Sequence, residues 1–123
     1  MIYAIIGSRD IPETEDNLHT LLTWLSWLSE RWGPIDEVVS GGARGADRLG
    51  EMVVDYGSMS LKVFPADWSK GKGAGFARNK DIAAYADCGV AIVNKPLKES
   101  RGTANTVALM RQQGKRVMIL RGF

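Results

Sequence analysis

The first seven residues, MIYAIIG (residues 1–7), form a continuous apolar run that ends in glycine. Side chains at successive positions of a strand point to opposite faces, so this run predicts a β-strand that is buried on both faces. Strands of this kind are typical of parallel sheets that are covered by helices on each side. The opening of the chain therefore indicates an α/β fold.

The rest of the chain alternates between helical and strand patterns. Leucines recur at helical spacing from Leu18 to Leu28, and Gly33-Pro34 ends that helix. Single helices between strands imply right-handed crossovers and a parallel sheet. We expect a Rossmann-like three-layer αβα fold with a five-stranded parallel sheet in the order 3-2-1-4-5. The later strands are predicted at residues 35–40, 61–64, 89–94 and 116–120, and the later helices from the glycine turn at 41–45 to about 56, at about 76–86 and at about 102–113.

Length and composition fit one globular domain that spans residues 1–123. No apolar run approaches the roughly 18 residues of a membrane-spanning helix, so we expect no membrane partner. The N-terminus lacks the basic leader and cleavage site of a signal peptide. The single cysteine, Cys88, suits a reducing compartment, and we expect a cytoplasmic protein.

The net charge of +2 is too small to indicate a nucleic-acid partner by itself, but the charges are unevenly distributed. After residue 94 the chain is basic, with Glu99 as its one acid. This C-terminal quarter could serve an anionic ligand, or it could be a solvated helix face. Its basic residues are Lys95, Lys98, Arg101, Arg111, Lys115, Arg116 and Arg121.

Three loops that follow predicted strands combine glycine with a hydroxyl or an arginine, and two of them open a helix. A helix N-terminus presents N–H groups and a partial positive charge to an anion. Glycine lets the backbone approach that anion, and arginine adds a planar fork that is always charged. Because the carboxyl ends of parallel strands share one edge of the sheet, we predict a phosphate-binding site there. Its expected residues are Gly7, Ser8, Arg9, Gly41, Gly42, Arg44, Gly45, Asp47, Ser100, Arg101, Gly102 and Thr103.

A fourth loop, at residues 65–75, is rich in glycine and lysine and contains Trp68. Trp68 could stack on a base, with Asp67 accepting from a sugar hydroxyl and Lys70 and Lys72 beside phosphates. The alternative is a surface loop in which Trp68 is a hydrophobic latch. The first turn of the next helix contains Arg78 and Asn79. These residues either face the same edge of the sheet or cap the helix.

Together these motifs resemble those of the SLOG superfamily, which includes the LOG and DprA proteins, and in particular its YspA-like, cpYpsA-related branch. The resemblance implies a single SLOG-like nucleotide-binding domain, with phosphate contacts from Gly41, Gly42, Arg44, Gly45, Gly102 and Thr103. The matching segments occur in the family's order over nearly the whole chain: GSR at 7–9, SGGARGAD at 40–47, FPADW at 64–68, AGFARN at 74–79 and SRGT at 100–103.

The LOG members of this superfamily are phosphoribohydrolases, and a glutamate of their GGxGTxxE motif takes part in cleaving the N-glycosidic bond. Thr106 occupies that position here, and a hydroxyl does not easily replace a carboxylate in such a step. The sequence therefore favours binding or sensing of a nucleotide or a nucleotide-derived phosphorylated ligand. One alternative is an enzyme that hydrolyses an N-glycosidic or phosphoester bond with Asp47 or Asp67, and the other is DprA-like nucleic-acid binding.

Two further expectations concern metals and assembly. No zinc site is expected from one histidine and one cysteine, but Mg²⁺ could accompany a phosphorylated ligand, held through water by Asp47 or Asp67. Trp24 and Trp27 lie beside the leucine stripe of the first helix. They either widen its buried face or form a homodimer contact.

Overall fold

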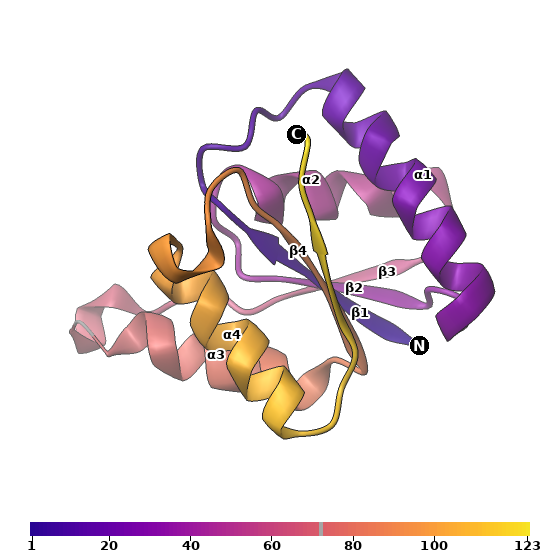
Figure 1. Cartoon of the computed structure of the whole chain (residues 1–123). Coiled ribbons are helices and arrows are strands. Elements are labelled where there is room, and N and C mark those ends of the chain that lie inside the picture. The colour runs from indigo at the N-terminus through magenta and orange to yellow at the C-terminus, as the bar shows by residue number, and fades with distance from the viewer. Residues whose placement is uncertain (72) are drawn as a thin grey trace.

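The computed structural model describes residues 1–71 and 73–123, and Lys72 lies outside the described residues. It confirms the predicted fold, with a parallel five-stranded sheet in the order β3-β2-β1-β4-β5 between two layers of helices (Figure 1). No helix in this part of the chain combines the length and the apolar character that a membrane span requires. The elements are β1 (Ile2–Gly7), α1 (Glu15–Trp32), β2 (Glu37–Ser40), α2 (Ala46–Val53), β3 (Ser60–Val63), α3 (Ala74–Tyr85), β4 (Cys88–Ile92), α4 (Arg101–Gln112) and β5 (Val117–Leu120), with short 3-10 turns at Val54–Tyr56, Trp68–Lys70 and Leu97–Glu99.

The central strand β1 divides its side chains between two hydrophobic cores. Tyr3 and Ile5 belong to the core under α1 and α2, whereas Ala4 and Ile6 belong to the core under α3 and α4. None of these four side chains is more than 5% exposed. The alternation of a strand thus explains both the continuous apolar run and the three layers.

Helix α1 covers one face of the sheet with the predicted leucines. The hydroxyl of Thr14 accepts a hydrogen bond from the Asn17 N–H at the start of the helix, and Gly33, at a φ of 115°, ends it. Trp24 and Trp27 remain 38% and 41% exposed and pack edge to face on each other. The prediction that these two tryptophans widen the buried face of α1 is therefore wrong. A homodimer contact through this helix stays a prediction.

The boundaries differ from the prediction mainly around residues 65–75. The segment predicted as a loop contains the 3-10 turn Trp68–Lys70, because the Asp67 carboxylate accepts a hydrogen bond from the Ser69 N–H and caps that turn. Helix α3 then begins at Ala74, two residues before the predicted start. The side-chain cap by Asp67 accounts for the turn, whereas the start of α3 at Gly73 has no side-chain cap.

The end of β1 should tolerate no side chain at Gly7. A Cβ there would lie 2.0 Å from the Ile92 carbonyl oxygen and 2.7 Å from the Ala46 Cβ, at a φ of 153°. We expect Gly7→Ala to lower the free energy of unfolding by at least about 3 kcal/mol in urea titrations. Gly102→Ala, in open space on α4, should change it by no more than about 1 kcal/mol. Equal effects of the two substitutions would contradict the packing argument.

Candidate functional site

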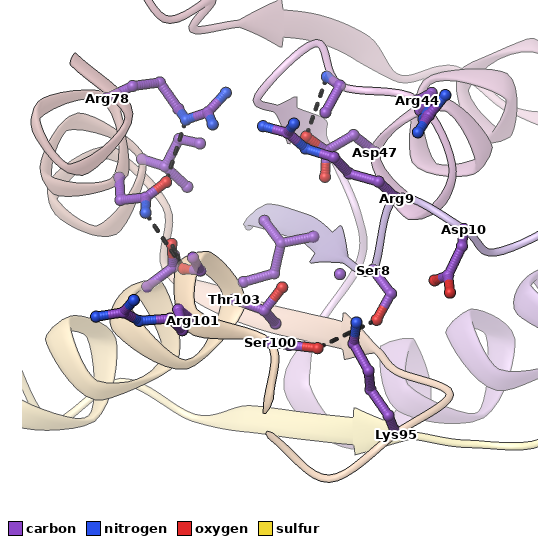
Figure 2. Close-up of a pocket in the computed structure, with 17 residues that line it drawn as sticks. Ser8, Arg9, Asp10, Arg44, Asp47, Arg78, Lys95, Ser100, Arg101 and Thr103 are labelled. Atoms are coloured by element: carbon purple, nitrogen blue, oxygen red, sulfur yellow. Dashed lines mark hydrogen bonds between the residues drawn. The ribbon is translucent and has the colours of Figure 1, made fainter. Parts of the chain in front are cut away.

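A cavity of about 420 Å³ opens at the carboxyl ends of the central strands β1 and β4, at the predicted edge of the sheet. The loops after β1, β2 and β4 contribute to its wall, and α3 closes one side (Figure 2). Its volume is within the usual range of small-molecule sites. The predicted residues that it brings together are Gly7, Ser8, Arg9, Arg44, Asp47, Arg78, Asn79, Ser100, Arg101, Gly102 and Thr103.

The other predicted residues lie outside this cavity. Gly41, Gly42 and Trp68 line a second cavity of about 370 Å³, which adjoins the first. Gly45 and Asp67 line neither of the two cavities in the described part of the chain. The predicted set is thus divided between two neighbouring spaces and the loops around them.

Asp67 has partners within its own turn. Its carboxylate accepts hydrogen bonds from the N–H and the hydroxyl of Ser69, and the Lys70 Nζ lies 3.9 Å from it. Because both charged groups are exposed, this ion pair contributes little to stability. The pair instead holds the carboxylate and the lysine near the turn that carries Trp68.

The glycine loop at residues 41–45 uses most of its N–H groups internally. The Gly42 N–H donates to a serine hydroxyl of β2, and the Ala43 N–H donates to the Asp47 carboxylate. The Gly45 N–H donates to the Glu13 carboxylate at 3.0 Å. Three of the five backbone donors of this loop are therefore already partnered, two of them by the protein's own acids.

The first turn of α4 has no such partners. Ser100 stands at its N-cap with its hydroxyl 3.4 Å from that of Ser8, and it makes no side-chain capping bond. Within the described part of the chain, the N–H groups of Arg101, Gly102 and Thr103 meet no acceptor. Because these residues line the first cavity, the start of α4 presents free donors and a partial positive charge to it.

Helix α3 ties the glycine loop to the start of α4. Arg78 donates to the Gly41 carbonyl at 2.6 Å, and its Nε donates to the Asn79 side chain. Asn79 in turn donates to the Gly102 carbonyl and to the Asn105 side chain, both at 3.2 Å. Arg78 lies on the second turn of α3 and not on the first, because the helix begins earlier than predicted. These bonds fix the spacing between the two loops.

The cavity carries an excess of positive charge. Five cationic side chains line it against two carboxylates. Within the described residues none of the five cations is held in an ion pair, so the excess is not neutralised locally. Such a cleft concentrates anions. The cations are Arg9, Arg44, Arg78, Lys95 and Arg101, and the acids are Asp10 and Asp47.

Asp47 is the most deeply buried of the ionisable residues that line this cavity. Its side chain is 6% exposed, and burial raises the pKa of its carboxyl to about 6. The Ala43 N–H and the Arg78 guanidinium oppose that rise, because both favour the ionised form. Burial also lowers the pKa of Arg78, and Asp47 opposes that change. The carboxyl can thus exchange a proton close to neutral pH.

The sequence did not identify three polar residues of the wall as ligand contacts. Lys95 and Asp10 extend the loops after β4 and β1, and the rule that sites lie beyond strand ends could have included both. Thr106 is 2% exposed and donates to the Gly102 carbonyl at 3.2 Å. Its position was compared with that of the glutamate in the LOG motif, but no local pattern indicated that Thr106 lines a cavity.

Comparisons of the chain with protein-family models, with curated proteins and with solved structures find no match. Among the described residues, no group of three or more histidine, cysteine or acidic side chains is placed to hold a metal ion. A Mg²⁺ ion that arrives with a phosphorylated ligand stays a prediction.

Asp47 should make the stability of the protein depend on pH. With its pKa raised to about 6, the folded state holds this proton more tightly than the unfolded chain does. Its contribution to stability is therefore present below about pH 4 and is lost as the pH rises toward 6. Relative to wild type, Asp47→Asn should gain about 2 to 3 kcal/mol of unfolding free energy between pH 4 and pH 7. Urea titrations at both values measure this gain, and a constant difference would contradict the raised pKa.

Proposed function

We propose that this chain binds a nucleotide or a nucleotide-derived phosphorylated ligand in the first cavity and holds it intact, as a binding or sensing module. The observation that carries the proposal is the meeting of five cations, which outnumber the two carboxylates of the cavity and form no ion pair in the described part of the chain, with the free N–H groups at the start of α4. An anion with several oxygen acceptors fits both features. The resemblance to the SLOG superfamily supports the same class of ligand.

The start of α4 is the best place for a phosphoryl group. The free N–H groups of Gly102 and Thr103 can donate to its oxygens, and the Thr103 hydroxyl lies on the same turn. The side chains of Arg44 and Arg101 are exposed and can rotate toward the anion. Guanidinium groups bind phosphate through two parallel hydrogen bonds, which gives orientation as well as affinity.

The glycine loop at residues 41–45 has a different part in this proposal. The N–H groups of Ala43 and Gly45 are partnered by Asp47 and Glu13, so an anion that uses these two donors would have to displace a carboxylate. The loop instead positions Arg44 beside the cavity and leaves space for a ligand on its outer side. The phosphate contacts that the resemblance implies are therefore proposed for α4 and for the arginines.

Arg44 provides the direct test. Its guanidinium is exposed and makes no hydrogen bond in the described part of the chain, so Arg44→Ala should leave the fold intact. We expect the substitution to weaken the binding of ADP at least about tenfold in isothermal titration calorimetry, through the loss of a charge-assisted hydrogen bond.

Arg111→Ala is the matched control, because Arg111 is an exposed arginine in the last turn of α4, away from the cavity. It removes the same charge and should leave the affinity within about twofold of wild type. If neither ADP nor inorganic pyrophosphate binds to the wild-type protein, the proposed function is wrong. If both substitutions weaken binding equally, overall charge and not the cavity is responsible.

A second candidate is a hydrolase that acts on an N-glycosidic or phosphoester bond of a nucleotide. The buried Asp47 carboxyl, with its pKa raised to about 6, favours this candidate because it lines the cavity and can take a proton from an attacking water molecule. Thr106 supplies no carboxylate, and the other acid of the cavity, Asp10, is exposed. The burial of Asp47 beside Arg78 also serves the loop geometry, which leaves binding as the first proposal.

The two candidates differ in the fate of the ligand. If Asp47 is a general base, wild-type protein incubated with AMP or ADP should release free base or phosphate, detected by mass spectrometry. Asp47→Asn should then lower the rate at least about 100-fold, the usual contribution of such a group. Intact AMP and ADP after incubation with wild-type protein would rule out the hydrolase and leave the binding function standing.

A further inference from the structure

The second cavity adjoins the first along a shared wall. Its volume is about 370 Å³, and the two cavities share the side chains of Arg9, Ala43, Arg44 and Arg78 in their walls. The three arginines therefore stand at the junction between the two spaces. Because Arg9 and Arg44 are exposed, a ligand larger than one phosphoryl group can extend past them from the first cavity into the second.

The far wall of the second cavity is apolar and aromatic. It is formed by Pro65, Ala66 and Trp68, and Trp68 is 59% exposed. A Cβ on Gly75 would lie 3.1 Å from the indole, so the start of α3 supports one edge of the ring. The described lining of this cavity holds no carboxylate. A supported, exposed indole of this kind is a platform on which a planar ring can stack.

The junction is the most suitable place for more than one negative charge. Burial lowers the pKa of Arg78 and the Asp47 carboxylate opposes that change. The positive charge of Arg9 lowers the pKa of Arg78 further, because the two guanidinium groups repel each other. Figure 2 shows these two side chains directed toward one another across the cavity. Arg9 and Arg44 make no ion pair in the described part of the chain. A ligand with adjacent phosphoryl groups would relieve this repulsion, whereas one phosphoryl group could reach only part of the cluster.

We propose that the ligand is a nucleoside di- or polyphosphate whose base stacks on Trp68 in the second cavity. Its phosphoryl groups cross the junction formed by Arg9, Arg44 and Arg78, and the terminal one reaches the free N–H groups of α4. This inference rests on the proposed function and adds the orientation of the ligand and the number of its phosphoryl groups. In this arrangement the ligand needs a base because of Trp68, and it needs adjacent phosphoryl groups because of the three arginines.

The test compares three probes and three variants by isothermal titration calorimetry. ADP should bind at least about tenfold more tightly than AMP, which lacks the second phosphoryl group, and than pyrophosphate, which lacks the base. Trp68→Ala should weaken the binding of ADP at least about tenfold and leave the affinity for pyrophosphate within about twofold of wild type. Trp68→Phe should retain most of the affinity for ADP, because phenylalanine keeps an aromatic face. Trp24→Ala, which removes a half-exposed indole from the outer side of α1, should have no effect.

The outcomes separate this inference from the function on which it rests. If pyrophosphate and ADP bind equally well and Trp68→Ala changes neither, the base site is wrong while phosphate binding stands. If AMP binds as tightly as ADP, the requirement for adjacent phosphoryl groups is wrong. If none of the three probes binds, both the inference and the proposed function are overturned. Quenching of tryptophan fluorescence by ADP, lost in Trp68→Ala, is an independent signal of stacking at this residue.

Discussion

The close approach of three backbone segments at the end of β1 is the constraint on which the site depends. The Ser8 N–H donates to the Ile92 carbonyl, so the chain after β1 stays against β4 for one more residue. A Cβ on Gly45 would lie 2.5 Å from the Ser8 carbonyl oxygen, so the start of α2 is equally close. No side chain fits between these segments. Glycine at residues 7 and 45 therefore allows the loops after β1, β2 and β4 to meet around one cavity.

Two helix N-termini lie beside this cavity, and the protein treats them differently. The start of α2 is covered by Glu13 and Asp47, which accept from the glycine loop, whereas the first turn of α4 has free N–H groups. The first arrangement stabilises the loop, because each partnered donor is one less unsatisfied group. The second leaves donors for an external anion. Arg9 and Arg78 repel each other beside the single buried carboxylate of Asp47, and a bound anion would offset that repulsion.

The fold could be predicted from local patterns because they agree with each other. The apolar run of β1 needs cover on both faces, and the leucine stripe of α1 supplies cover for one of them. The prediction was weaker where single contacts decide the structure. A cap by Asp67 gave the loop at 65–75 a helical turn, and the half-exposed positions of Trp24 and Trp27 depend on how α1 is rotated on the sheet. Such contacts leave no periodic signal.

The sequence by itself determined the αβα architecture, the strand order and the edge of the sheet where the loops gather, because hydrophobic periodicity and the handedness of crossovers constrain these features. It also selected most residues of the first cavity, because glycine, hydroxyl and arginine positions follow the strand ends. Only the tertiary structure decided which N–H groups are free, because Glu13 reaches Gly45 across 32 positions of the chain. The same is true of the buried state of Asp47 and of the junction between the two cavities, since burial and proximity arise from packing among elements that are distant in sequence.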